Sequence, residues 1–301
     1  MHGVPVRAEH LGLKGPRGWA FRGISLDAGP GALIAVEGPS GSGRTCLLLA
    51  LSGRMKATEG TAAVGAARLP KQLAAARRIS AVANVAGVTD LEPALTVGEH
   101  LRERALLQRR FGDSLRDLVR PRAERRARAR QRIDDALTAV GLDLESLPKG
   151  ARTAVRDLER IEALRLSVAL ALVGKPRLLA VDDADLKLSE SERAEVRALL
   201  ASIAEAGTTV VAVCGEALPG AVVIRTGNTA DTATAGSTAT AGSTGSTGST
   251  EAAGTAEAAE AAQAAQAAQA AQAAQAAQAA QAAKTSEDKE AGDALAATGR
   301  A

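Results

Sequence analysis

One glycine-rich segment has the residue types and spacing of a phosphate-binding loop. Residues 38–45 read Gly-Pro-Ser-Gly-Ser-Gly-Arg-Thr, which fits the pattern G-x-x-x-x-G-K-[ST] except at the lysine position. Glycines let the backbone turn tightly and aim several N–H groups at one anion, and a following helix adds its positive N-terminal end. We therefore expect the phosphates of a nucleotide to bind at Gly38, Pro39, Ser40, Gly41, Ser42, Gly43, Arg44, Thr45 and Cys46.

The lysine position of the pattern is occupied by Arg44, and the last position by Thr45. The hydroxyl of Thr45 is expected to coordinate Mg²⁺. A guanidinium binds phosphate well, but it is bulkier than an ammonium group and forked. Nucleotide binding can therefore survive at Arg44 while the geometry for transferring the terminal phosphoryl group is degraded. The alternative is a glycine-rich turn without a ligand.

Apolar runs and capping patterns predict alternating strands and helices over residues 1–225. Such alternation indicates an α/β fold in which helices cover both faces of a parallel sheet. A stretch from about 85 to 155 has helical patterns without a strand signal and is interpreted as a helical insert. Strands are expected at Val4–His10, Ile24–Asp27, Ala32–Val36, Ile79–Ala83, Leu178–Val181 and Thr208–Val213. Helices are expected at Cys46–Ser52, from Thr96 to about Arg110, at Arg122–Val140, at Leu158–Val173 and from Ser189 to about Ala206.

The composition changes sharply near Gly227. Gly-Ser-Thr repeats come first, followed by an Ala-Ala-Gln array with glutamine at every third position from Gln263 to Gln281. Three residues advance a helix by about 300°, so these positions drift around its axis and leave no fixed apolar stripe to bury. Residues 226–301 are therefore expected to be a low-complexity tail, disordered or frayed-helical.

Charge and composition limit the class of protein. The chain has 301 residues and a net charge of +3, of which residues 226–301 contribute −5 and residues 1–225 therefore +8. A basic globular part suggests an anionic partner such as a nucleotide, a nucleic acid or a lipid surface. No apolar run reaches the ~18 residues that are needed to span a bilayer. The N-terminal residues lack the pattern of a secretory signal, so none is expected. Two distant cysteines, Cys46 and Cys214, fit a reducing, cytosolic compartment.

Taken in order, these segments resemble the ATP-binding subunits of ABC transporters over about residues 4–225. Leu95–Glu99 is similar to the family's L-T-V-x-E segment, and Arg165–Pro176 to its signature helix and proline-terminated exit. Leu178–Asp183 resembles the Walker B strand, and Thr208–Val213 the last core strand. The resemblance implies a P-loop NTPase of ABC type, with a mostly parallel central sheet, an N-terminal antiparallel β part and a helical insert.

The resemblance also implies roles for single residues. Asp182 falls where the family holds Mg²⁺ through bound waters, so Thr45 and Asp182 are the expected metal-site residues. Asp183 falls where the family has the catalytic glutamate that polarises the attacking water, and it is one methylene shorter. Asn84 is the expected counterpart of the lid-loop glutamine. Trp19, the single tryptophan of the chain, is the candidate for stacking on adenine, with a place at the edge of the core as the alternative.

Two segments depart from the family. Its L-S-G-G-Q signature, which clamps the terminal phosphate of a partner subunit's nucleotide, falls on Leu158–Glu162, where only the leucine matches. If Glu159 and Glu162 pointed inward, they would present negative charge there. The family's switch histidine, expected near Cys214-Gly215, is absent.

These features leave more than one function open. The first is an ATP-binding subunit, cytoplasmic and peripheral at the inner face of the cell membrane, that uses ATP and Mg²⁺ to drive a separate membrane permease as a homodimer or heterodimer. It would be an ABC-type ATPase with weak hydrolysis. The alternative is a catalytically impaired regulatory or scaffold subunit that pairs with a consensus ABC ATPase. A soluble ABC protein acting on DNA or ribosomes is less favoured, because such proteins usually carry two cassettes and this sequence has one phosphate loop.

A run of arginines lies inside the expected insert. Arg120–Arg132 holds seven arginines and one glutamate. A solvated helix face is one interpretation, and a surface that meets the permease or anionic headgroups is another. Nucleic acid is an unlikely partner, because the run lacks interleaved aromatic side chains for stacking on bases.

Overall fold

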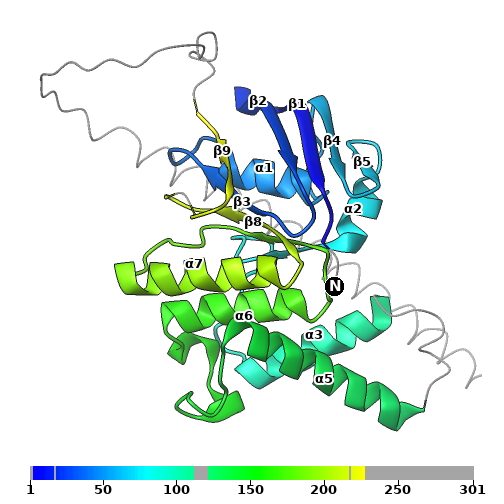
Figure 1. The fold of residues 1–301 in the computed structure, drawn as a ribbon. Helices are drawn as coiled ribbons and strands as arrows, with labels where there is room; N and C mark the ends of the chain where they lie inside the picture. The colour runs from blue at the N-terminus through cyan, green and yellow to red at the C-terminus, as the bar shows by residue number, and fades with distance from the viewer. Residues whose placement is uncertain (1–2, 17, 112–120, 217, 228–301) are drawn as a thin grey trace, which may run out of the picture. The chain divides into compact units, whose positions relative to one another are not determined.

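Two β-sheets of different character organise the computed structural model, which describes residues 3–16, 18–111, 121–216 and 218–227 (Figure 1). One sheet is antiparallel, with the strand order β2-β1-β4-β5, and the other has the order β6-β7-β8-β3-β9 with parallel neighbours throughout. Its strands are β6 (Ser80–Ala83), β7 (Leu178–Val181), β8 (Thr209–Val213), β3 (Leu33–Glu37) and β9 (Val222–Arg225). The antiparallel strands are β1 (Val6–Gly15), β2 (Gly18–Ala28), β4 (Glu59–Val64) and β5 (Ala67–Leu69).

Helices cover both faces of the parallel sheet, as the sequence predicts. They are α1 (Arg44–Leu51), α2 (Leu73–Ile79), α3 (Val97–Phe111), α5 (Arg122–Val140), α6 (Arg160–Leu172) and α7 (Glu190–Glu205). Figure 1 shows α1 on one side of the β3–β8 pair and α6 and α7 on the other. The α/β class, the parallel sheet and the N-terminal antiparallel part are confirmed.

Strand β3 shows why a short apolar run can sit between two helical layers. Successive side chains of a strand point to opposite faces. Leu33 and Ala35 pack into the cluster formed with α3, α5, α6 and α7, whereas Ile34 and Val36 pack into the cluster formed with α1 and the antiparallel sheet. Because both faces are buried, the strand is apolar at every position up to Val36. Glu37 ends the strand, and the phosphate loop follows directly at Gly38.

The expected helix boundaries agree with local chemistry. Ser189 caps α7 by accepting from the N–H of Glu192, whose carboxylate accepts from the N–H of Ser189. The same reciprocal pair forms between Thr96 and Glu99 at the start of α3. Helix α5 ends at Gly141, which has a φ of 61°. Such a left-handed residue satisfies the last carbonyls of a helix at little steric cost when it is glycine.

Sequence reasoning did not predict strands β4, β5 and β9 or helix α2. Strands β4 and β5 read Glu-Gly-Thr-Ala-Ala-Val and Ala-Arg-Leu, which contain few β-branched or aromatic residues. They pair with each other around Gly65, whose φ is 58°, and β4 also pairs with β1. Tertiary pairing therefore makes strands of segments that have weak propensity of their own.

The proposed insert and tail can be placed only in part. Helices α3 and α5 lie inside the stretch 85–155, whose described residues make no strand and a single bridge, between Thr96 and Ala154. Glu124 and Arg128 of the arginine run form an ion pair of 3.3 Å on α5, and Arg120 lies outside the described residues. The limits 1–225 and 226–301 stay predictions, because the tail beyond Gly227 also lies outside them.

Candidate functional site

The phosphate loop joins the end of β3 to the start of α1, as the pattern requires. Gly43 lies directly before the helix with a φ of 81°, and a Cβ atom there would come within 2.1 Å of the Ala20 carbonyl oxygen. Gly38 has a φ of 152°, and a Cβ there would come within 2.1 Å of the Thr226 carbonyl oxygen. These two glycines are therefore required by close backbone approach as well as by dihedral angle.

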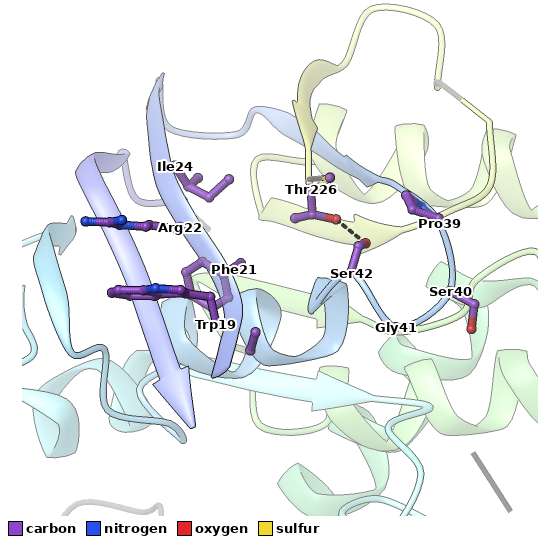
Figure 2. A pocket seen from close by; sticks show the side chains of 11 residues that line it. Trp19, Phe21, Arg22, Ile24, Pro39, Ser40, Gly41, Ser42 and Thr226 are labelled. Carbon is purple, nitrogen blue, oxygen red and sulfur yellow. Dashed lines mark hydrogen bonds between the residues drawn. The ribbon is translucent and has the colours of Figure 1, made fainter. Parts of the chain in front are cut away.

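Thr226, which sequence reasoning missed, closes on the phosphate loop from the end of β9 (Figure 2). Its N–H and its hydroxyl both donate to the Glu37 carbonyl, at 2.7 and 3.0 Å. Its hydroxyl oxygen also lies 2.7 Å from the Ser42 hydroxyl oxygen. Thr226 is buried, with 2% of its surface exposed, so it fixes the conformation of the loop.

The hydroxyl of Thr45 and the carboxylate of Asp182 meet at the carboxyl edge of the parallel sheet. Thr45 lies in the first turn of α1, and Asp182 directly follows β7. The Thr45 Oγ1 donates to the Asp182 Oδ2 at 2.8 Å. The two residues expected to serve Mg²⁺ are thus brought together across 137 positions of sequence.

Asp182 is a buried acid with one oxygen still available. It is 3% exposed, and its Oδ1 has no hydrogen-bond partner among the described residues. Burial raises the pKa of Asp182 above its ordinary value, and the charge of Asp183 raises it further. The hydrogen bond from Thr45 and the charge of Arg44 lower it. A cation beside the free oxygen would stabilise the ionised form.

Asp183 and Asn84 follow neighbouring strands and both adopt left-handed backbone angles. Their φ values are 43° and 56°. Asparagine and aspartate tolerate this region better than most residues. The Asn84 amide donates to the carbonyls of Asp182 and Asp183, at 2.8 and 3.4 Å, so it ties the two strand ends together. None of the described hydrogen bonds uses the Asp183 carboxylate.

Arg44 and Cys46 lie in the first turn of α1, both half-buried. None of the described hydrogen bonds uses the Arg44 guanidinium, although its charge reaches Asp182. Burial, and then the charge of Asp182, raises the pKa of the Cys46 thiol. The thiol is therefore held neutral next to the loop, whereas the arginine carries the positive charge.

A pocket of about 350 Å³ lies between the loop and β2 (Figure 2). It is lined by Trp19, Ala20, Phe21, Arg22, Ile24, Pro39, Ser40, Gly41, Ser42, Thr226 and Gly227. Trp19 is 38% exposed, and the Arg22 guanidinium lies 4.5 Å from the centre of its ring. Glu59 holds that guanidinium through a 2.9 Å ion pair. The pocket joins Trp19 to the loop, and stacking of Trp19 on adenine stays a prediction.

The segment at the signature position caps its own helix. Glu159 is the N-cap of α6, and its side chain and that of Glu162 form a reciprocal capping box. The Glu159 N–H donates to the Glu162 Oε2 at 2.8 Å. Two carboxylates therefore occupy the positive N-terminal end of α6.

The segment after β8 has a carboxylate partner in place of the missing histidine. The Gly215 N–H donates to the Asp185 Oδ2 at 2.6 Å, a contact that the sequence did not indicate. Cys214 is buried, and burial raises the pKa of its thiol to about 12. Cys214 is thus a small buried hydrophobic residue, and Asp185 holds the turn beside it.

Removing the Thr226 hydroxyl tests its role in positioning the loop. Thr226→Val keeps the shape of the side chain but leaves Ser42 without this partner, so we expect affinity for ATP to fall about tenfold. Thr226→Ser keeps the hydroxyl and should bind ATP within about threefold of wild type. Calorimetric titration gives both affinities, and melting temperatures check the fold. Equal affinity of wild type and Thr226→Val would exclude the role.

Comparison with known proteins identifies the family. Residues 21–185 match the family described as ABC transporter. The Fe(3+) ions import ATP-binding protein FbpC of Streptomyces avermitilis is 33% identical over 221 residues, which cover 70% of this chain and 57% of that protein. The cytochrome c biogenesis ATP-binding export protein CcmA of Pseudomonas putida is 30% identical over 212 residues, covering 69% and 89%. The chain spans 23% of the ABC transporter G family member 22 of Arabidopsis thaliana.

Solved structures show the same fold. A dimeric ATP-binding cassette in a post-hydrolysis state, bound to ADP and Pi, superposes with a TM-score of 0.53 at 22% identity over 70% of this chain and 88% of that one. A subunit of an ABC transporter complex from Clostridium perfringens gives 0.54 at 18% identity over 71% and 80%. No helix in the described ranges is long and apolar enough to cross a membrane. The chain belongs to the ABC transporter family and carries its nucleotide-binding domain.

Proposed function

We propose that this chain is the ATP-binding subunit of an ABC transporter, coupling the binding and hydrolysis of Mg-ATP to a separate membrane permease. It would act as a homodimer or heterodimer at the inner face of the cell membrane. The observation that carries the proposal is the contact of Thr45 with Asp182 beside the phosphate loop. The relatives support it, since they include ATP-binding proteins of import and export systems.

Magnesium fits the residues at the edge of the sheet. Mg²⁺ prefers hard oxygen ligands, keeps several waters and is usually held by one or two protein groups plus phosphates. Thr45 and Asp182 offer such oxygens, and the free Oδ1 of Asp182 is buried. No cluster of three or more His, Cys, Asp or Glu side chains that could hold a metal occurs in the part of the chain described. When bound, the ion would supply positive charge to the phosphate oxygens.

Other residues of the chain would bind the phosphates and orient the attacking water. The N–H groups of the loop and α1 hold the phosphates, and the Arg44 guanidinium adds charge beside them. The Asp183 carboxylate accepts a hydrogen bond from the attacking water and orients it. Its reach is set by the turn that Asn84 ties down. A shorter acid and a forked cation are expected to slow the transfer without abolishing nucleotide binding.

Loss of the Thr45 hydroxyl tests the binding site. Thr45→Val removes the donor to Asp182 and the proposed metal ligand, so affinity for ATP with Mg²⁺ should fall at least about tenfold. The full chain is titrated with ATP, with and without Mg²⁺, in a calorimeter. Thr61→Val, an exposed threonine of β4, is the matched control and should bind as wild type does. Absence of ATP binding by wild type would overturn the proposal.

Hydrolysis is tested separately by release of phosphate. We expect slow release from wild type and none above background from Asp183→Asn. The double variant Arg44→Lys with Asp183→Glu restores the residues of the family pattern, and its rate should rise at least about tenfold. Tight ATP binding without any release, in wild type and double variant alike, would exclude an ATPase.

The alternative, a regulatory or scaffold subunit that pairs with a consensus ABC ATPase, has its own support. By the resemblance, Glu159 and Glu162 fall in the segment with which the family clamps a partner subunit's nucleotide, and both carboxylates cap α6. Negative charge at this place opposes a bound polyphosphate, because like charges brought together cost several kcal/mol at an interface. Two copies of this chain would then close poorly on ATP, whereas its own loop could serve a partner with a consensus signature.

Neutralising the two carboxylates tests this alternative. Glu159→Gln with Glu162→Gln keeps groups able to cap α6 but removes two negative charges, so ATP-dependent self-association should tighten about tenfold. Sedimentation with Mg-ATP measures the dimer. Glu99→Gln makes the same change in the capping box of α3 and should leave self-association unchanged. If the neutral variant associates no better than wild type, the carboxylates do not oppose closure.

A further inference from the structure

Positive charge is concentrated in one part of the chain. Residues 97–132 hold twelve arginines and five acidic residues, a net charge of +7, whereas residues 1–225 together carry +8. The remainder of residues 1–225 is therefore close to neutral. No residue of 97–132 belongs to the phosphate loop or lines the pocket beside Trp19. Nucleotide binding therefore does not account for this charge.

Helix α5 carries most of the charge in its first half. Residues 122–132 hold six arginines and one glutamate, whereas residues 133–140 hold two aspartates and no basic side chain. The described residues that anchor α5 in the core lie in the second half, at Ala136, Leu137 and Val140. The first half extends beyond α6, away from the parallel sheet (Figure 1). We call residues 122–132 the arginine arm.

The arm has one carboxylate for its six arginines. Glu124 and Arg128 form the ion pair of 3.3 Å on α5. Arg126 and Arg130 are exposed, and none of the described ion pairs or hydrogen bonds uses their guanidinium groups. The arm therefore presents positive charge to solvent along about three turns of helix.

This charge is unfavourable for the helix that carries it. Arg126 and Arg130 lie four positions apart, and like charges at that spacing destabilise a helix. Positive side chains in the first turns also oppose the helix macrodipole. Pro121, at the N-cap, makes no side-chain hydrogen bond that would offset this. A negative surface outside the chain would relieve the repulsion, so the arm favours an anionic partner.

The shape of the arm favours one kind of anionic partner. Small side chains stand between the arginines, with Ala123 and Ala127 exposed and Ala129 half-buried. None of the described pockets is lined by a residue of the arm. A helix without a pocket or an aromatic side chain has no means to enclose a small ligand or to stack on bases. An extended sheet of negative charge, such as a layer of anionic headgroups, needs neither.

We infer that the arginine arm binds the headgroups of anionic lipids at a membrane surface. The guanidinium groups pair with phosphate oxygens of the headgroups. The contact stays at the depth of the headgroups, because the described side chains of the arm include no apolar residue larger than alanine. The inference goes beyond the proposed function, since the arm needs neither nucleotide nor permease to bind lipid.

Vesicle sedimentation tests the inference with the full chain. One set of vesicles contains phosphatidylglycerol and phosphatidylcholine in equal parts, and the other contains phosphatidylcholine alone. At low salt we expect the chain to bind the first set at least about tenfold more tightly than the second. High salt should remove the difference, because it screens charges at the surface. Equal binding to both sets, or binding to neither, would overturn the inference.

Substitutions in the arm locate the contact. Arg126→Gln with Arg130→Gln should weaken binding to the anionic vesicles at least about tenfold. Arg126→Lys with Arg130→Lys keeps the charge and should bind within about threefold of wild type. Arg68→Gln with Lys71→Gln removes the same charge from two exposed side chains at β5 and should have no effect. An equal loss in both glutamine variants would show non-specific attraction and exclude the arm as the site.

The melting temperature separates a lipid-binding role from a structural one. Loss of the charges at Arg126 and Arg130 relieves repulsion within α5, so the glutamine variant of the arm should melt at the temperature of wild type or higher. A lower melting temperature together with lost vesicle binding would assign these arginines a structural role and contradict the inference.

Nucleic acid is the competing partner for a basic helix. Duplex DNA and duplex RNA are each added to chain bound on anionic vesicles, at equal concentrations of phosphate. We expect the chain to stay on the vesicles, because the arm lacks groups that read or stack on bases. Displacement by either duplex would show that the arm prefers nucleic acid, and the inference would fail.

ATP affinity, measured on the same samples, keeps the two proposals apart. The glutamine variant of the arm should bind ATP as wild type does, since neither Arg126 nor Arg130 lines the pocket at the phosphate loop. Preference for anionic vesicles without ATP binding would support the inference and exclude the proposed function. ATP binding without that preference would exclude the inference and leave the proposed function standing.

Discussion

Asp182 is buried at the end of β7 with a hydrogen bond to only one of its two carboxylate oxygens. A buried charge is costly unless a donor or a cation compensates it. The Thr45 hydroxyl compensates one oxygen, and this bond holds the start of α1 against the edge of the sheet. The other oxygen, Oδ1, is buried without a hydrogen-bond partner among the described residues. The strands β7, β8 and β3 lie side by side and run parallel, so the loop after β3 and Asp182 after β7 lie at the same edge of the sheet.

Much of this site could be predicted because its signals are local. The glycines of the loop mark it in the sequence as a phosphate loop. They are needed because only glycine tolerates the close approach of Ala20 to Gly43 and of Thr226 to Gly38. Asp182 can be predicted as a site residue because it directly follows the apolar strand β7. The carboxyl ends of parallel strands meet at one edge, so the proximity of Thr45 to Asp182 followed from fold class. Family resemblance added the roles of Asp183 and Asn84, which the backbone geometry alone does not assign.

The features that escaped prediction depend on pairing between distant segments. Thr226 follows the short strand β9, whose sequence Val-Val-Ile-Arg carries no motif that marks a binding site. It reaches Ser42 only because β9 pairs with β3. The orientation of Glu159 and Glu162 was open in the sequence, since a carboxylate near a helix start can cap that helix or point away from it. In the structure both side chains cap α6. The negative charge is therefore fixed at the helix start.

Strand β6 has polar contacts at both of its ends. At its first residue, the Ser80 hydroxyl accepts from the Arg54 guanidinium at 3.1 Å. Directly after its last residue, the Asn84 amide donates to the carbonyls that follow β7. The strand has four residues and pairs with β7 along its whole length. The contact of Arg54 therefore lies on the same paired strand whose other end leads into the turn held by Asn84.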